Sequence, residues 1–311
     1  MSHKPVMIKE VIDLFCERIP PTKKFLDATF GRGGHTRALL EHIPDCKVWA
    51  LDQDIEAVRF GEVEFSEYIS QGRLKIIQSN FTDFEEKCEQ RVFDGILLDL
   101  GVSSPQLDVA TRGFSFYHEG PLDMRMDQSQ GITAQDIVNG WSERDLSALF
   151  RELGEISNPD RVVRAIVSDR KKKKFTTTRE LAGMVERLCG WRKKGHHPAT
   201  NFFLALRLSV NGELDVIVEA LPKMVRALSE NGRLIVLTFH SLEDRIVKNI
   251  FKGSLELGRL INKKVIVPSR DEILSNPRSR SAKLRAFEKG HKVGDKVGQK
   301  MGESHESAST N

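Results

Sequence analysis

Three acidic residues that follow apolar runs are the first candidates for chemistry in this sequence. Asp27, Asp52 and Asp99 each stand directly behind a short apolar segment. Apolar runs of this length, separated by amphipathic stretches, indicate buried strands of a parallel sheet. Open α/β sheets bind ligands at the carboxyl ends of their strands, where these three side chains are expected to meet. We therefore predict one ligand site that contains all three carboxylates.

A glycine loop follows the first predicted strand. Gly31, Gly33 and Gly34 lie in the segment DATFGRGGH, which leads into the first predicted helix. Glycines let the backbone turn tightly and approach a ligand, and the helix start adds free N–H donors. In a dinucleotide-binding loop a third glycine would occupy the position of Thr36. A carboxylate at Asp27 suits the ammonium group of a methionine moiety better than it suits a pyrophosphate.

The spacing of the second carboxylate indicates a nucleoside ligand. Asp52 follows Gly31 by 21 residues, where an acidic side chain can bind both ribose hydroxyls. Phe81, behind the third predicted strand, would lie beside an adenine, although core packing fits its position equally well. Asp27 or Asp52 alone could be a helix cap or a turn residue. The presence of both carboxylates around one glycine loop favours a cofactor site over these local roles.

The loop behind the fourth predicted strand has residues that can accept a proton. It reads DLGVSSPQ from Asp99 onward and includes Ser103. Methylation of an exocyclic amine needs acceptors on its N–H groups, and one of them can take the released proton. Asp99 and Ser103 stand where amino-methyltransferases place such groups. His240, behind a later strand, could line the same target pocket, and a helix cap at Ser241 is the local-structure alternative.

The cysteines argue against a different methylation chemistry and against a metal site. Attack on C5 of cytosine needs a cysteine nucleophile, and no cysteine lies on a strand-end loop of the first half of the sheet. They form no C-x-x-C pair and no zinc-type spacing with histidine, so we expect reduced thiols and no metal. The four are Cys16, Cys46, Cys88 and Cys189.

The order of the predicted elements defines the fold class. Strands are predicted at 25–29, 48–51, 74–77, 93–98, 232–239, 264–267 and 284–287. Helical patterns alone fill the stretch between the fourth and fifth strands. We therefore predict an α/β fold with a doubly wound, mostly parallel Rossmann-like sheet and an all-helical inserted domain. The expected parts are the sheet domain (1–107 and 211–289), the helical insertion (108–210) and a disordered tail (290–311).

The charge of the 311 residues is unevenly spread. Net charge is +4, but residues 1–100 carry 13 Lys/Arg against 18 Asp/Glu, and residues 161–207 carry 13 against 3. Two interpretations of this basic block fit equally well: it contacts phosphates, or it is a solvated face of helices. Aromatic and arginine side chains in 112–127 could also hold a flipped-out base. The RNA-binding candidates are Arg112, Arg125, Lys171, Lys172, Arg192, Lys193, His197 and Arg207.

Membrane insertion is not expected. No apolar run approaches the roughly 20 residues that span a bilayer. The first residues, MSHKP, have neither the apolar region of a signal peptide nor an Arg-rich presequence. We therefore expect a cytoplasmic protein.

Several long motifs resemble one bacterial family. The runs DGILLDLGVSSPQLD (94–108) and GPLDMRMD (120–127) are similar to the ribosomal RNA small subunit methyltransferase H family, of the MraW type. Similar stretches run from about residue 3 to 289. The resemblance implies a class I methyltransferase sheet, S-adenosylmethionine as donor, and N4-methylation of a cytidine in the decoding region of 16S rRNA. It also implies that the helical insertion recognises the substrate, which is 16S rRNA or the small ribosomal subunit; a homodimer is possible.

The resemblance also assigns cofactor contacts, all in the loops at the predicted strand ends. Asp52 would hold the ribose and Phe81 would lie by the adenine. The remaining contacts would come from Gly33, Gly34 and His35 in the glycine loop and from Asp99 and Gln106 behind the fourth strand.

Two departures from the family pattern lie outside these loops. The family motif ATRTFQALR reads ATNFFLALR at 199–207, and GEE reads GEI at Gly154-Glu155-Ile156. Both changes bear on RNA contacts more than on methyl transfer. A non-catalytic RNA-binding ribosome-assembly factor is one alternative, which the complete cofactor constellation disfavours. A NAD-dependent oxidoreductase is another, which Asp27 and the missing third glycine disfavour.

Overall fold

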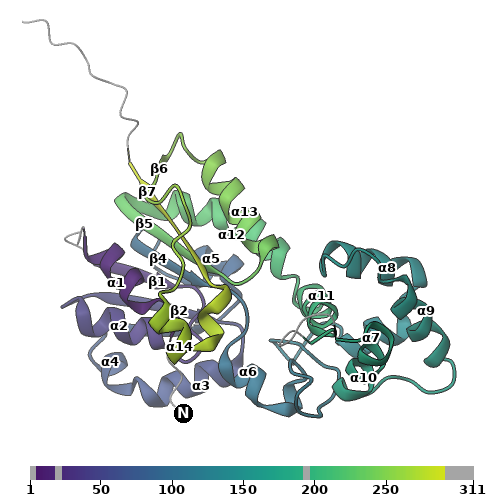
Figure 1. Ribbon diagram of the computed structural model, residues 1–311. Coiled ribbons are helices and arrows are strands. Elements are labelled where there is room, and N and C mark those ends of the chain that lie inside the picture. The colour runs from purple at the N-terminus through teal and green to yellow at the C-terminus, as the bar shows by residue number, and fades with distance from the viewer. Residues whose placement is uncertain (1–4, 18–22, 192–196, 291–311) are drawn as a thin grey trace, which may run out of the picture.

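A seven-stranded sheet forms the centre of the protein, in the order β3-β2-β1-β4-β5-β7-β6 (Figure 1). The computed structural model describes residues 5–17, 23–191 and 197–290. The strands are β1 (Lys24–Asp27), β2 (Lys47–Asp52), β3 (Leu74–Gln78), β4 (Phe93–Asp99), β5 (Leu228–Thr238), β6 (Gly258–Leu260) and β7 (Lys283–Lys289). Strands β1 to β5 are parallel, and β7 is antiparallel to both of its neighbours. The predicted mostly parallel sheet is confirmed.

Helices cover both faces of the sheet, because both faces are apolar. On β4, Leu97 packs into one core with helices α1 and α2, whereas Ile96 and Leu98 pack into another with α12 and α13. This alternation is what a strand buried on both sides requires. The covering helices are α1 (Ile8–Cys16), α2 (Gly34–His42), α3 (Ile55–Glu64), α4 (Ser66–Ser70), η1 (Phe81–Asp83), α5 (Phe84–Lys87), α12 (Glu213–Ala227), α13 (Ser241–Gly253), α14 (Arg270–Ser275) and η3 (Pro277–Ser281).

One predicted strand is wrong. The run 264–267 pairs only through an isolated bridge between Ile266 and Leu284. The sixth strand is instead Gly258–Leu260, which pairs with β7. Its three residues include Arg259, whose guanidinium bonds to Glu288 of β7 (2.7 Å). A strand this short and polar leaves no alternating pattern in the sequence.

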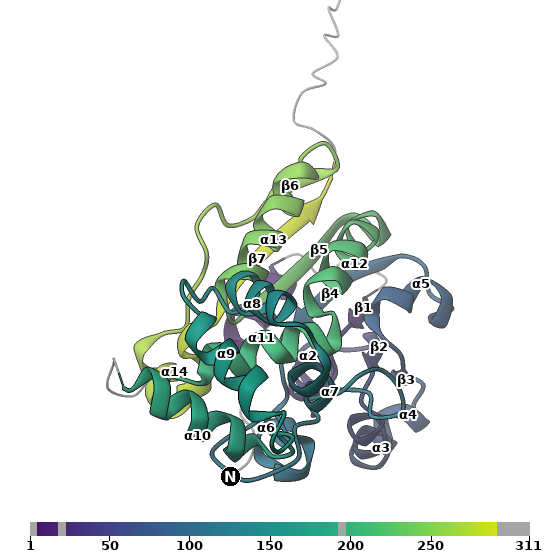
Figure 2. The ribbon, with the colours of Figure 1, turned by 90° about the vertical axis from the view of Figure 1, so that its right-hand side faces the viewer.

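The helices of the insertion form a second body with its own core (Figures 1 and 2). They are η2 (Ala110–Arg112), α7 (Ala134–Gly140), α8 (Glu143–Glu152), α9 (Asp160–Asp169), α10 (Thr178–Cys189) and α11 (Thr200–Asn211), and the short helix α6 (Ser104–Asp108) leads into them from β4. Phe150, Ile166 and Leu206 are fully buried in this core. Thr177 starts α10 as a capping box with Glu180, in which each side chain bonds to the other's backbone. The all-helical character predicted for this stretch is confirmed.

Two further observations concern the residues that the structure describes. None of their helices is long and apolar enough to cross a membrane. All four cysteines lie among them and are unpaired, as expected. Arg192, Lys193 and residues 291–311, which were predicted as RNA contacts and as a disordered tail, lie outside the described residues.

Candidate active site

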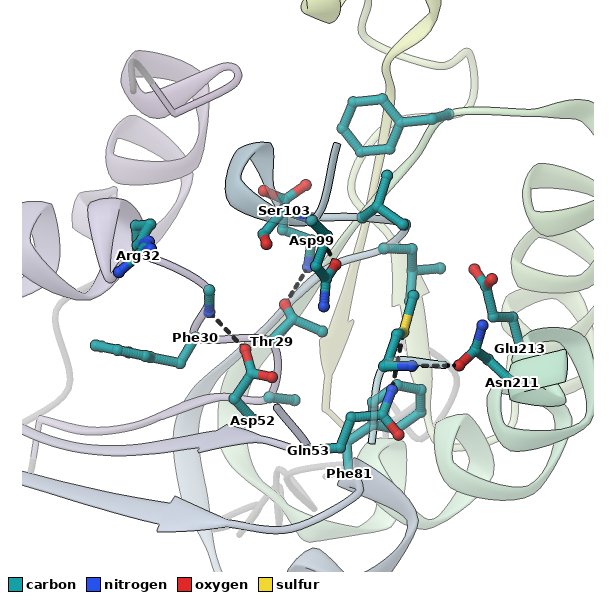
Figure 3. A pocket seen from close by; sticks show the side chains of 18 of the residues that line it. Thr29, Phe30, Arg32, Asp52, Gln53, Phe81, Asp99, Ser103, Asn211 and Glu213 are labelled. Carbon is teal, nitrogen blue, oxygen red and sulfur yellow. Dashed lines mark hydrogen bonds between the residues drawn. The ribbon is translucent and has the colours of Figure 1, made fainter. Parts of the chain in front are cut away.

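A cavity of about 300 Å³ lies at the carboxyl ends of the parallel strands, between the sheet and the base of the insertion (Figure 3). Most of the predicted site residues line it: Gly31, Gly34, His35, Asp52, Phe81, Asp99, Ser103, Gln106 and Arg207. Asp27, Gly33 and His240 do not belong to its lining. The structure therefore brings together two of the three strand-end carboxylates and leaves the third behind the wall.

Asp52 ties the glycine loop to the end of β2. Its carboxylate accepts hydrogen bonds from the backbone N–H of Gly31 (2.7 Å) and of Asp54 (2.8 Å). Burial raises the pKa of Asp52 to about 6, against the opposing effect of these two N–H donors. Phe81 lies across the cavity floor from the loop, on η1, which Asn80 caps. A ribose hydroxyl between Asp52 and the loop would meet an acceptor, with an aromatic face close by.

Asp99 has an unused acceptor atom in the wall of the cavity. Its Oδ1 is buried and receives no hydrogen bond from the described residues. Its Oδ2 lies 3.6 Å from Nδ1 of His35. Burial is the main reason that the pKa of Asp99 rises to about 6, and the carboxylates of Asp27 and Glu243 add to the rise. A buried acceptor without a partner is costly, so this atom fits a donor supplied by a ligand.

His35 turns its Nδ1 toward Asp99, and in the neutral ring this nitrogen is an acceptor. Its Nε2 lies 2.9 Å from the carbonyl oxygen of Val6, which can only accept, so the proton belongs on Nε2. The lone pair of Nδ1 then points toward Asp99. Between the two groups there is therefore a place for one proton or for the N–H of a ligand.

The three glycines of the loop have different roles. A Cβ at Gly34 would overlap the Pro5 ring, and one at Gly33 would overlap the rings of Phe30 and Phe65. Gly33 also has a positive φ of 69°. Only Gly31 has open space, with its nearest neighbour, the Cβ of Ser103, 3.8 Å from such a Cβ. Close approach of a ligand therefore concerns Gly31, whereas the other two glycines let the protein pack against the loop.

The prediction that Asp27 faces the ligand is wrong. Its side chain is 1% exposed. It accepts hydrogen bonds from Thr36 Oγ1 (2.6 Å) and from the backbone N–H of Thr29 (3.2 Å). Burial raises its pKa, although these bonds and His35 oppose the shift. Asp27 anchors the first turn of α2, and this explains why a threonine replaces the third glycine of the dinucleotide pattern.

The prediction that Arg112 contacts RNA is also wrong. The residue is 3% exposed, and its guanidinium bonds to Asp54 (2.7 Å) and to the backbone carbonyl of Met126 (3.0 Å). Asp54 also accepts from Nε2 of Gln106 (3.0 Å), and Oε1 of Gln106 accepts from the backbone N–H of Ser103 (2.9 Å). This buried network fixes the loop behind β4 against the loop behind β2.

Two other predicted RNA contacts are held by carboxylates. Arg207, on α11, makes a two-pronged ion pair with Glu213 (2.8 and 2.9 Å) at the cavity wall. Arg125 makes a similar pair with Asp123 (2.9 and 2.8 Å). Both guanidiniums are therefore already paired, and neither is free to bind a phosphate.

The remaining predicted RNA contacts that the structure describes are two exposed lysines and a largely buried histidine of the insertion. Lys171 and Lys172 are exposed. His197 stacks at 4.5 Å on Phe116, measured between ring centroids. These side chains remain candidates for RNA contact.

His240 is a helix cap, so its predicted place in the target pocket is wrong. It is the N-cap of α13, and its Nε2 lies 3.0 Å from Oε1 of Glu243. The capping-box partner is thus Glu243, and the cap lies one residue before the predicted Ser241. Glu243 and Phe239 line the cavity in its place. Burial raises the pKa of Glu243, but the bond to His240 and the nearby charges, including Arg207, outweigh it and leave the pKa low.

Sequence analysis missed several lining residues. They are Pro5, Gln53, Met126, Asn211, Glu213, Glu243 and Arg278, among others. Gln53 directly follows Asp52 at the end of the predicted second strand. It could have been found by treating the residue after each strand-end carboxylate as a candidate too. Asn211 and Glu213 flank Gly212 at the junction of α11 and α12, where no strand end marks them. Among the described residues no cluster of His, Cys, Asp and Glu could hold a metal ion.

The strand order, the single antiparallel strand within it and the nucleoside-sized cavity at the ends of β1, β2 and β4 define a class I methyltransferase that uses S-adenosylmethionine. The MraW methylase family model matches residues 1–290. The chain belongs to this family and is a methyltransferase, which leaves the oxidoreductase alternative without support.

Several known proteins are similar to this chain. The chain is 55% identical to a ribosomal RNA small subunit methyltransferase H of Bdellovibrio bacteriovorus, over 93% of this chain and 88% of the relative. It is 45% identical to the protein of the same name from Crocosphaera subtropica, over 91% and 88%. The crystal structure of an rRNA methylase from Streptococcus thermophilus aligns with a TM-score of 0.45 at 12% identity, over 94% of this chain and 99% of that one.

Proposed function

We propose that this protein transfers a methyl group from S-adenosylmethionine to N4 of a cytidine in the decoding region of 16S rRNA. Family membership and the names of the relatives support the reaction and the substrate class. The observation that carries the chemistry is the buried, unpartnered Oδ1 of Asp99 in the wall of the cavity. The site of action is the cytoplasm, on 16S rRNA or the small subunit that contains it.

The sheet side of the cavity suits the cofactor. Asp52 would accept from the ribose hydroxyls, and Phe81 would lie against the adenine. His35 and the edge of the glycine loop at Gly31 would surround the methionine part. When bound, S-adenosylmethionine supplies an electrophilic methyl group on a sulfonium. Leu100 and Val102 of the loop behind β4 line the cavity, and apolar side chains there would exclude water from the reaction.

Asp99 would act on the cytosine amine. Its ionised Oδ1 accepts one N4–H, which localises the nitrogen lone pair and turns it toward the methyl carbon. The new N–C bond forms as the S–C bond breaks, and the N4 proton leaves to the carboxylate. With a pKa of about 6, Asp99 is ionised at neutral pH and can still hold that proton briefly before passing it to water.

The helical insertion would present the RNA. We place its limits at 108–210, between two parts of the methyltransferase domain at 1–107 and 211–289. It reaches the cavity through Arg207 and Met126. A hydrogen bond from Gln53 Nε2 to Met126 Sδ (2.9 Å) also connects it to the loop behind β2. A base bound at the insertion side would therefore enter opposite the cofactor.

The test is a mass-spectrometric nucleoside analysis of 16S rRNA from a host that lacks the equivalent enzyme, with and without this protein. We expect N4-methylated cytidine only when the protein is present. The Asp99→Ala variant, expressed at equal level, is the matched control and should leave the mark absent. Binding of S-adenosylmethionine without any methylated cytidine would contradict the proposal and would favour an assembly factor that retains the cofactor site.

A further inference from the structure

Four rings gather on the surface of the insertion, from Phe116, Tyr117, Trp191 and His197, and we call them the aromatic platform. Phe116 lies 4.5 Å from His197 and 4.9 Å from Tyr117, measured between ring centroids, and Trp191 lies 5.1 Å from His197. Tyr117 is 66% exposed and Trp191 is 55% exposed. Large rings this exposed retain most of their contact with water, although they lie beside an apolar core.

The rings are held in place from below. Phe116 packs edge-on against Phe203 of the insertion core, with centroids 4.9 Å apart. Nδ1 of His197 accepts from the backbone N–H of Ala199 (3.1 Å). Glu186 accepts from the indole N–H of Trp191 and lies 3.8 Å from Nε2 of His197. The outer faces of Tyr117 and Trp191 are thus fixed before any partner arrives.

The platform lies beside an exposed arginine of α10. Arg179, on α10, donates from its guanidinium to the backbone carbonyl of Tyr117 (3.3 Å), and the residue is exposed. Residues 161–207 carry 13 Lys/Arg against 3 Asp/Glu. Glu186, the acidic residue closest to the rings, already bonds to Trp191. Exposed rings beside an exposed arginine complement a polyanion that also offers flat bases.

The platform is connected to the cavity by one stretch of chain. Tyr117 and Met126 are nine residues apart, and Met126 lines the cavity. Between them, Gly120 bonds through its backbone N–H to Oγ1 of Thr178 (3.2 Å), and Leu122 bonds to the carbonyl of Thr176 (3.0 Å). This stretch is therefore fastened to the start of α10, so the platform keeps a fixed position relative to the cavity mouth.

We propose that the aromatic platform binds unpaired bases of single-stranded RNA by stacking, with Tyr117 and Trp191 as the two stacking residues. Stacking on exposed aromatic rings beside cationic side chains is how proteins hold single strands, whereas a duplex keeps its base faces covered. The inference rests on the proposed function, since the strand is the one that carries the target cytidine. The platform binds bases next to that cytidine and leaves the cytidine itself to the cavity.

The test compares three variants of the whole protein. Tyr117→Ala/Trp191→Ala removes both stacking faces, Tyr117→Phe/Trp191→Phe keeps them, and Val63→Ala removes exposed apolar surface on α3 (Val63 is 79% exposed). Each is titrated with a single-stranded and a double-stranded 16S rRNA fragment of equal length. Loss of one stacked base weakens binding about 5- to 100-fold. We expect at least that loss for the double alanine variant on the single strand, and little change for the other two.

Kinetics and fluorescence complete the test. The double alanine variant should raise KM for the RNA with a kcat close to that of the parent and unchanged binding of S-adenosylhomocysteine. The parent should also lose tryptophan fluorescence on binding the single strand, and Trp191→Phe should remove most of that change. Equal single-strand affinity in the alanine and phenylalanine variants would overturn the inference, as would equal loss of duplex and single-strand binding. If the parent methylates no cytidine, the proposed function fails instead, whatever the platform binds.

Discussion

Acidic residues at the sheet edge and arginines at the base of the insertion are used in opposite ways. Asp52 and Asp99 are half-buried at strand ends, and Asp99 keeps an oxygen without a partner in the described structure. Arg112 and Arg207 are also shielded, but their guanidiniums are occupied by carboxylates or carbonyls of the same chain. Of the strand-end carboxylates, Asp99 keeps an available oxygen and Asp27 does not, because two threonines occupy both oxygens of Asp27. The two arginines resemble Asp27 in this respect.

The largest effect is expected from the sheet edge. Replacing Asp99 by Asn keeps the shape of the side chain but removes the acceptor for the N4 proton, so kcat should fall about 10²- to 10⁴-fold. Methyl transfer to a 16S rRNA fragment measures it, and calorimetry with S-adenosylhomocysteine separates the cofactor contact. Ser103→Ala is the control and should cost far less. A kcat near that of the parent would remove Asp99 from the role of proton acceptor.

The second effect tests the arginines. Arg112→Ala leaves Asp54 as an unpaired buried charge, and breaking such a pair costs about 3–5 kcal/mol of the free energy of unfolding. Denaturant unfolding measures it, with the exposed Lys171→Ala as the matched control, which should change little. RNA affinity per folded molecule should stay at the parent value in Arg112→Ala. A stable Arg112→Ala variant with weakened RNA binding would reverse the contrast between the two regions.

The third effect is a pH dependence at the sheet edge. Because Asp52 and Asp99 have pKa values raised to about 6, both become protonated as pH falls from 7 to 5. If the ionised forms hold the cofactor, affinity for S-adenosylhomocysteine should drop up to about tenfold for each carboxyl over that range. Calorimetry at several pH values measures it, and Asp52→Asn should make the profile shallower. A flat profile in the parent would mean that neither charge contributes to binding.

Stability of the free protein should follow the opposite trend. The folded pKa values lie above the ordinary 3.8 of an aspartate, so the native state holds protons that the unfolded chain releases between about pH 4 and 6. The contribution of these two carboxyls to the free energy of unfolding is therefore fully present below about pH 4 and is lost as pH rises to about 6. Thermal melts without cofactor check this sign.

The smallest effect belongs to the exposed lysines. Each phosphate contact on a single strand contributes about 0.7 to the slope of log K against log salt. Lys171→Ala/Lys172→Ala should therefore lower the slope by about 1.4 and weaken RNA binding only modestly. Lys252→Ala, an exposed lysine on α13, is the control and should leave the slope unchanged. An unchanged slope in the double variant would identify these lysines as a solvated face.

The main strands could be predicted from sequence alone, because the polar residue that follows each apolar run marks where the strand ends. Asp52 and Asp99 were located in this way. The prediction failed at Asp27, because the hydroxyl of Thr36 nine residues later determines which way that carboxylate turns. It failed at Arg112 for a similar reason, since its partner Asp54 lies 58 residues earlier. Pairings between distant residues leave no local pattern, and they decide whether a charge is available.

The N-terminal segment of the chain is held in place by residues from the C-terminal part of the fold. The backbone N–H of Met7 donates to Glu272 (2.7 Å), and Arg233 bonds to Glu17 (2.8 Å). Val6 positions His35. A nascent chain that has not yet released residue 272 from the ribosome therefore lacks the contact that secures this wall of the cavity. This wall of the cavity, which includes His35, is therefore complete only when residues from both ends of the fold are present together.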